Sequence, residues 1–242
     1  MIQIIKKMFE EEPIIRFTPF SGAPDCSEIT NIKLAKDVKP KWLESQKIFK
    51  PEEKFVNCPG MDDLYKSGYI IPAWTDIKIK ANKAGTIVKL HNEYPIPVQP
   101  MAPKLVQGII EIDKNVKFVP LKLNSPWAIF TKSGYSAFVL PATYHSPFLK
   151  DLFVYSGIVD YDNFSTINMI FCALRECEIV IPAGTPLLQI IPYKREVITG
   201  EVTSSNQRDI NKNNFQFPTR VKSAYRKFFH KKKVYKLINK SI

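Results

Sequence analysis

Two aspartates, Asp160 and Asp162, interrupt an apolar run and are the residues of this sequence best suited to acid–base chemistry. They follow residues 157–159, Gly-Ile-Val, which predict a short strand that ends in a turn. A carboxylate held on such a hairpin can act as a general base that activates water. It can equally be the polar end of the turn, where an aspartate side chain accepts backbone N–H groups in an Asx-turn. Both interpretations of Asp160 stay open at this point.

A second stretch, residues 182–191, contains Gly184, which lies 24 positions after Asp160, and Gln189, five positions later. The tripeptide around Gly184 predicts a turn between two strands, in which glycine permits a positive φ. Gln189 is either a binding residue or a core residue that bonds to a neighbouring strand. Upstream, residues 131–134 read Thr-Lys-Ser-Gly.

In combination, these motifs resemble those of the dUTP diphosphatase and dCTP deaminase superfamily. In that superfamily a G-[VI]-[IV]-D hairpin is followed, at similar spacing, by a G-x-x-x-x-Q strand, and residues 131–134 lie where the family has P-R-S-G. The resemblance covers roughly residues 125–195. It implies a mainly β fold, dUTPase-like, described as a β-clip or distorted antiparallel barrel, which commonly assembles as a trimer.

The resemblance also implies a site. Asp160 would be the catalytic residue, activating a water that attacks a phosphate, with Mg²⁺ as cofactor if the chain is an enzyme. Otherwise no cofactor is expected, and no metal-ligand pattern is present in the sequence. The implied ligand-binding residues are Lys132, Ser133, Gly134, Asp162, Phe164 and Gln189.

Three departures from the family pattern favour a chain that has retained the fold of the family and lost its catalytic activity. Lys132 replaces an arginine, and lysine cannot clamp a phosphate through two parallel bonds. Asn163 stands where the family has an aromatic residue. No glycine-rich closing arm follows, since Gly200 is the only glycine after Gly184.

A closer resemblance is to a family of uncharacterised phage and bacterial proteins, which transfers no known activity. Their shared pattern, SG-V-V-D-x-D followed by G-T-P-x-x-Q-x-I-P-x-x-R, is matched here by residues 156–162 and 184–195. The same pattern has an upstream P-G-Y-S, which here reads Ser-Gly-Tyr-Ser at residues 133–136.

The 242-residue chain divides into four predicted segments. Residues 1–56 form an irregular N-terminal extension, with a strand near residues 14–17 and a short helix in KPKWLESQKIF. Residues 57–200 form the core domain, because short apolar runs recur there between proline, glycine and asparagine punctuation. The strands expected in it are 68–71, 75–81, 85–90, 108–112, 127–131, 136–140, 153–155, 168–174, 178–181 and 187–192. Residues 201–218 are a polar linker.

Residues 219–242 contain nine basic residues and no acidic one, out of a net charge of +12 for the chain. Apolar residues at helical spacing predict a basic amphipathic helix. Such a helix suits an acidic protein surface, nucleic-acid phosphates or an anionic membrane surface. The tail residues expected to make these contacts are Arg220, Lys222, Arg226, Lys227, Lys231, Lys232 and Lys233.

Two functions from different classes compete. The first is a non-catalytic or divergent dUTPase-like β domain of phage type, acting as a structural virion component or a ligand-binding module, with the tail contacting an acidic partner or nucleic acid. The second is an active nucleoside-triphosphate diphosphatase with Asp160 as general base. No run of about 18 apolar residues exists, so no transmembrane segment is expected. The expected location is the cytoplasm of a host cell or a virion, without secretion.

Overall fold

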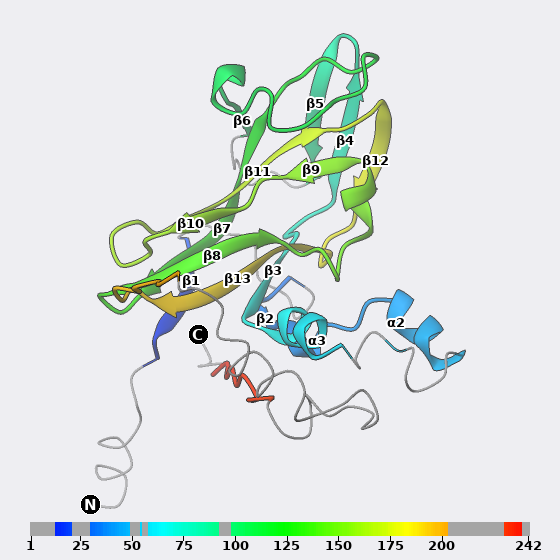
Figure 1. Cartoon of the computed structure of the whole chain (residues 1–242). Helices are drawn as coiled ribbons and strands as arrows, with labels where there is room; N and C mark the ends of the chain where they lie inside the picture. Colours follow the sequence, from blue (N-terminus) through cyan, green and yellow to red (C-terminus); the bar gives the residue numbers. More distant parts are fainter. Residues whose placement is uncertain are drawn as a thin grey trace, which may run out of the picture. The chain divides into compact units, whose positions relative to one another are not determined.

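The computed structural model describes residues 13–20, 30–48, 54, 58–91, 98–202 and 230–238. These residues belong to two compact units (Figure 1). Unit 1 contains residues 1–33 and 68–195, and unit 2 contains residues 34–67 and 196–242. In the part of the chain that the structure describes, no helix has the length and apolar character needed to cross a bilayer.

Unit 1 consists of three antiparallel sheets (Figure 1). Sheet A has the order β1 (Ile15–Pro19), β7 (Leu121–Thr131), β11 (Thr166–Ala173) and β9 (Leu152–Val154), and β6 (Val98–Pro100) also pairs with β7. Sheet B has the order β10 (Gly157–Val159), β8 (Tyr135–Pro141), β13 (Pro186–Lys194), β3 (Tyr69–Pro72) and β2 (Lys33–Leu34). Sheet C has the order β12 (Cys177–Ile181), β4 (Ile77–Asn82) and β5 (Gly85–Leu90). Two short 3₁₀ helices, η5 (Pro103–Leu105) and η6 (Pro147–Lys150), lie in connections.

The predicted mainly β, antiparallel fold is confirmed, and the described strands form three separate sheets without closing into a barrel. Most expected strands are present, and β5 has the predicted limits. The strand expected at residues 108–112 is wrong, since these residues lie in turns and irregular structure. Ile109 is 59% exposed there, so this apolar run has no core to cover.

The core of unit 1 lies where the alternating side chains of the long strands meet. Ile129 of β7, together with Ile167 and Phe171 of β11, has no exposed surface. The close approach of two backbones requires a glycine at position 68, just before β3. Gly68 has a φ of +70°, and a Cβ atom there would lie 2.0 Å from the carbonyl oxygen of Ile190 in β13. Only glycine adopts this conformation at such a contact without strain.

Unit 2 contains the short helices. They are η1 (Ala35–Asp37), α2 (Trp42–Ser45), η2 (Gln46–Ile48) and α3 (Pro59–Lys66). The short helix expected in KPKWLESQKIF is present as α2 and η2. Helix α3 begins at a proline, which tolerates the first helical position because its missing N–H would be unpaired there. Tyr65 anchors α3, since its ring is 2% exposed and its hydroxyl donates to the carbonyl of Val38 at 2.6 Å.

The predicted C-terminal helix is absent over residues 230–238, which have no regular secondary structure. In this segment the basic side chains reach Asp63 of α3. Nε2 of His230 lies 2.9 Å from Oδ1 of Asp63, and Lys233 also donates to that carboxylate. Helix propensity is a weak preference, and tertiary contacts such as these to Asp63 override it. The other residues of the predicted helix, 219–229 and 239–242, lie outside the described part.

Candidate functional site

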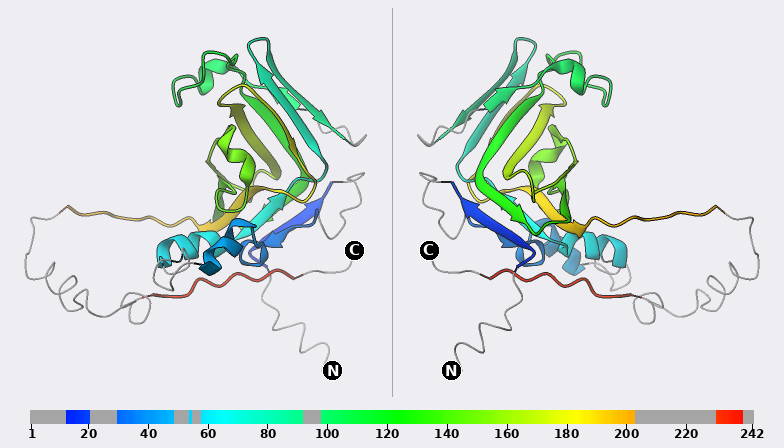
Figure 2. Two further views of the ribbon diagram at one scale, coloured as in Figure 1. Left: turned by 90° about the vertical axis from the view of Figure 1, so that its right-hand side faces the viewer. Right: turned by 90° about the vertical axis from the view of Figure 1, so that its left-hand side faces the viewer.

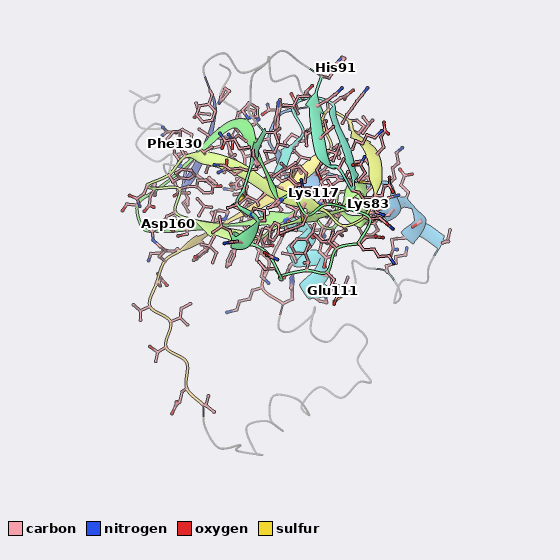
Figure 3. All side chains as sticks on the ribbon, turned by 90° about the horizontal axis from the view of Figure 1, so that it is seen from above. Lys83, His91, Glu111, Lys117, Phe130 and Asp160 are labelled. Carbon is pink, nitrogen blue, oxygen red and sulfur yellow. The ribbon has the colours of Figure 1, made fainter. Side chains whose placement is uncertain are left out.

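The strand expected before Asp160 exists as β10, and Asp160 begins the turn after it, but the predicted hairpin is wrong, because β10 and the next strand, β11, belong to different sheets. Strand β10 pairs with β8, so that Val159 lies opposite Ala137. The carbonyl oxygen of Asp160 then accepts the backbone N–H groups of Asn163 and Phe164, at 2.9 and 3.0 Å. The turn is fixed to the core by Tyr161, which is 2% exposed. This turn leaves the Asp160 side chain at the protein surface, 57% exposed (Figure 3).

The Asp160 carboxylate is bonded to two side chains from other strands. Ser136 of β8 donates its hydroxyl to Oδ1 at 2.5 Å. Nη1 of Arg195, just beyond the end of β13, lies 3.1 Å from the same oxygen and 3.2 Å from Oγ of Ser136. Asp160 is therefore part of a cross-strand contact. The Asx-turn expected for its side chain is wrong, because its bonds are to side chains and not to the N–H groups of its own turn.

Asp162 is the more deeply held of the two aspartates. Its side chain is 8% exposed and accepts the backbone N–H of Gly134 at 3.0 Å. Both terminal nitrogens of Arg195 bond to it, Nη1 to Oδ1 at 3.1 Å and Nη2 to Oδ2. This bidentate geometry is the strongest form of an arginine–carboxylate contact. We call the set Gly134, Ser136, Asp160, Asp162 and Arg195 the Arg195 network.

Charges shift the ionisation of the Arg195 network in a consistent direction. The hydrogen bond from Arg195 holds the pKa of Asp162 below its usual range, and the N–H of Gly134 adds to the effect. The same hydrogen bond raises the pKa of Arg195. The pair is therefore charged on both sides throughout the neutral range.

Two other predicted residues of the 131–134 motif lie beside the network. Lys132 and Ser133 are exposed in the turn between β7 and β8 that also contains Gly134. Arg195 is fastened to this turn by its backbone N–H, which donates to the carbonyl of Gly134 at 2.8 Å. Phe164 ends the Asp160 turn with a 49% exposed ring. The structure thus gathers Lys132, Ser133, Gly134, Asp160, Asp162 and Phe164 at one end of sheet B.

Gln189 is not in this group. It lies in β13, opposite Leu140 of β8 and Ile70 of β3, and is 2% exposed. Ser136 lies opposite Tyr193, so four residues of extended strand separate Gln189 from the network, roughly 13 Å. The expected turn before it is confirmed, since Gly184 has a φ of +81°.

Mg²⁺ does not fit the Arg195 network. A divalent cation needs several open carboxylate oxygens, whereas three of the four oxygens of Asp160 and Asp162 already bond to the positive guanidinium of Arg195. Across the described ranges, no group of three or more histidine, cysteine, aspartate or glutamate side chains is placed to hold a metal ion.

Arg195 and Ser136 are the site residues that sequence reasoning missed. Both belong to the pattern of the uncharacterised phage and bacterial proteins, Ser136 ending S-G-Y-S and Arg195 ending I-P-x-x-R. A serine and an arginine that accompany two aspartates in one motif set are a signal for an ion-pair network. The pattern alone does not show which acid they contact, because the contacts join three strands.

The tail residues are placed only in part. Lys231 and Lys232 are exposed, whereas Lys233 bonds to Asp63. Burial acts to raise the pKa of Asp63, but the hydrogen bonds from Lys233 and His230 outweigh it and the pKa is lowered. Four further tail residues lie outside the described part: Arg220, Lys222, Arg226 and Lys227.

Comparison with solved structures finds dUTPases, the family that the sequence motifs resemble. The native dUTPase of EIAV covers 79% of this chain and 98% of its own, with 11% identity and a TM-score of 0.36. A mutant dUTPase from phage phi11 of S. aureus, whose structure details the coordination of a structural Mg(II) ion, covers 73% and 95%, with 8% identity and a TM-score of 0.31. No protein-family model and no curated protein matches the chain. Both TM-scores are below 0.5, and the fold is therefore described by its strand order alone.

Proposed function

We propose that this chain is a non-catalytic, dUTPase-like β domain of phage type that acts as a structural virion component or a ligand-binding module. One observation carries the proposal: Arg195 bonds to both aspartates that a hydrolytic site would need. A general base must accept a proton from water, and a carboxylate oxygen that already accepts bonds from a guanidinium and a hydroxyl is poorly suited to do so.

The contacts of the network support a structural role directly. Arg195 belongs to the end of β13, Gly134 and Ser136 belong to the β7–β8 turn and β8, and the aspartates follow β10. A bidentate ion pair across three chain segments resists their separation, and Asp162 is sufficiently buried that its charge depends on the partner. The Arg195 network therefore holds the end of β13, the β7–β8 turn and the turn after β10 together at one end of sheet B.

The test is a nucleotide panel. Purified protein is incubated with the common nucleoside triphosphates and Mg²⁺, and pyrophosphate release is followed for the wild type and the Asp160→Ala variant. The proposal expects the two proteins to match the buffer blank with every nucleotide. Turnover that is lost in Asp160→Ala would show that Asp160 is a general base and would overturn the non-catalytic assignment.

A thermal-shift screen separates the structural version from the ligand-binding version. A ligand that binds only the folded chain raises the melting temperature by mass action. If the same nucleotides and simple phosphates leave the Tm unchanged, the structural role is favoured. A rise in Tm without turnover favours the ligand-binding module, with Lys132 and Ser133 as the residues to substitute next.

The lysine-rich tail is proposed to contact an acidic protein surface or nucleic acid. Lys231 and Lys232 are exposed in the described segment, which supports such a contact. The variant Lys231→Gln/Lys232→Gln is expected to weaken binding to DNA or to an acidic protein and to reduce its salt dependence. The matched control is Lys233→Gln, whose charge is already shared with Asp63 and should matter less.

A second candidate, the nucleoside-triphosphate diphosphatase, has one observation in its favour. The Asp160 side chain is 57% exposed, and only its Oδ1 is bonded among the described residues. In that function Asp160 would be the general base, with Lys132 and Ser133 at the phosphates, and the active sites would lie between the subunits of a trimer. Its location, like that of the non-catalytic module, would be the cytoplasm of a host cell or a virion.

A further inference from the structure

The outer face of sheet C carries lysines that are aligned across strands, and two of them have no acidic partner among the described residues. Strand β4 alternates buried and exposed positions, with Ile77, Ile79 and Ala81 inside and Lys78 and Lys80 outside. The β4–β5 hairpin extends beyond the other strands of unit 1 (Figure 2). Lys78 and Lys80 are exposed to solvent on its outer face.

The register places two lysines directly opposite each other. Lys78 of β4 pairs with Lys89 of β5, and both side chains are exposed. Residues directly opposite in an antiparallel pair share a face, and like charges there are destabilising. Neither lysine has an ion pair with a described residue, so the repulsion is not relieved within this part of the chain.

The rest of the face continues the positive charge. Lys80 lies between Glu178 and Ile87, and its pair with Glu178, at 3.3 Å, is exposed on both sides and therefore weak. Lys83 extends the charge at the hairpin turn. Lys117 lies beside that turn, because its N–H donates to the carbonyl of Asn82 at 3.0 Å (Figure 3).

We propose that this face, defined by Lys78, Lys80, Lys83, Lys89 and Lys117, binds the phosphate backbone of double-stranded nucleic acid. Alternate residues of a strand lie about 7 Å apart, which is twice the axial rise of about 3.4 Å per nucleotide in a duplex strand. A regular array of phosphates satisfies the opposed lysines together, and binding then relieves their mutual repulsion.

The side chains of the face favour a duplex over other polyanions. Single strands are held by stacking of bases on aromatic rings, and the residues that share this face with the lysines are Val180, Glu178 and Ile87. Binding to a membrane surface uses an amphipathic helix or interfacial aromatic residues, and this face is a sheet without them. Contacts to phosphates alone make the binding independent of base sequence.

The test measures binding of the full-length protein to a 30-base-pair DNA duplex by fluorescence anisotropy, over a series of salt concentrations. The variant Lys78→Gln/Lys89→Gln removes the opposed pair. The matched control, Lys33→Gln/Lys36→Gln, removes the same charge from two exposed lysines outside sheet C. A third protein, Lys78→Arg/Lys89→Arg, keeps the charge at the face.

The proposal expects the face variant to bind at least tenfold more weakly near 100 mM salt. It also expects the slope of log Kd against log salt to fall by about 2, since each phosphate contact contributes about 0.9. The control keeps the wild-type slope, and the arginine variant keeps the wild-type affinity. The Tm of the face variant does not fall, because the substitution removes a repulsion.

Two results would overturn the proposal. Equal weakening of the face variant and the control would show that only the net charge matters, and unchanged binding by the face variant would show that sheet C is not used. Vesicles rich in phosphatidylserine are the competing surface. Loss of vesicle sedimentation without loss of duplex binding would reassign the face to a membrane. The tail variants are separate proteins, so their failure leaves this result intact.

Discussion

Charged side chains are organised in opposite ways at two places in unit 1. In the Arg195 network, one arginine forms ion pairs with two aspartates, and the contacts join three chain segments. On the outer face of sheet C, Lys78 and Lys89 oppose each other without an acid between them. Figure 3 shows Asp160 of the Arg195 network well separated from Lys83, which lies in the β4–β5 turn of sheet C.

The difference separates charges that hold the fold from charges that are available to a ligand. A paired and partly buried group contributes to stability through its partner, and removing one member leaves the other at a cost. An exposed charged side chain without an opposite charge contributes little to stability or lowers it. Such a side chain is available to bind a ligand of opposite charge. We therefore expect substitutions at the two places to act in opposite directions on stability.

The largest effect is expected at Arg195. Arg195→Met removes the guanidinium from both aspartates and leaves Asp162, with its 8% exposed side chain, without its cation. The Tm should fall further than for any other substitution discussed here. Lys89→Met removes the same charge from sheet C and is the matched control, measured by thermal unfolding under the same conditions. A fall of equal size in the control would remove the distinction between the two places.

The two aspartates are expected to rank in a definite order. Asp162→Asn loses a bidentate contact in a buried position, whereas Asp160→Asn changes a side chain that is 57% exposed. Substitutions of exposed ion pairs usually change the free energy of unfolding by less than about 1 kcal/mol. Urea unfolding should therefore show a small change for Asp160→Asn and a clearly larger loss for Asp162→Asn. The reverse order would place the main contact of Arg195 at Asp160.

Acid should weaken the stabilising contribution of the Arg195 network over a predictable pH range. The pKa of Asp162 is lowered by Arg195, so its contribution to stability is complete above the usual aspartate pKa of about 4. That contribution is lost as the pH falls from there through the lowered pKa of the folded protein. Urea unfolding at a series of pH values should show a shallower acid loss for Asp162→Asn than for the wild type. If the free energy of unfolding falls with pH in parallel for the two proteins, Asp162 does not contribute to the acid loss of stability.

The smallest effect is expected on sheet C. Lys78→Gln relieves the repulsion from Lys89 and should raise the free energy of unfolding by about 0.3 kcal/mol at low salt. The gain should shrink at high salt, because exposed charges are screened. Lys33→Gln is the control with no opposed lysine among the described pairings, and it should show no such gain.

Local signals in the sequence predicted the parts of this fold that depend on few residues. Strand β5 has its predicted limits, since a glycine opens it and a short run with β-branched residues continues to Leu90. The turn at Gly184 needed only the positive φ that glycine allows. The turn that begins at Asp160 is similarly local, but the pairing of β10 with β8 is not, since the two strands are about twenty residues apart.

Contacts between distant residues account for what the sequence did not predict. The partner of the two aspartates, Arg195, is more than thirty positions away and is carried by a different strand. Strand β1 pairs with β7 across more than one hundred residues, which periodicity does not indicate. The distribution of charge along the sequence predicts a basic tail. It does not predict that Lys78 and Lys89 lie opposite each other, because that depends on the register of β4 and β5.

The measurement that tests the central claim most directly is single-turnover pyrophosphate release from dUTP with Mg²⁺, with the protein in excess over the nucleotide. This design detects even one reaction per site. The account predicts that the wild type and Asp160→Ala both release no more pyrophosphate than buffer, because Arg195 and Ser136 already occupy Oδ1 of Asp160. A phase of release in the wild type that is absent in Asp160→Ala would contradict it.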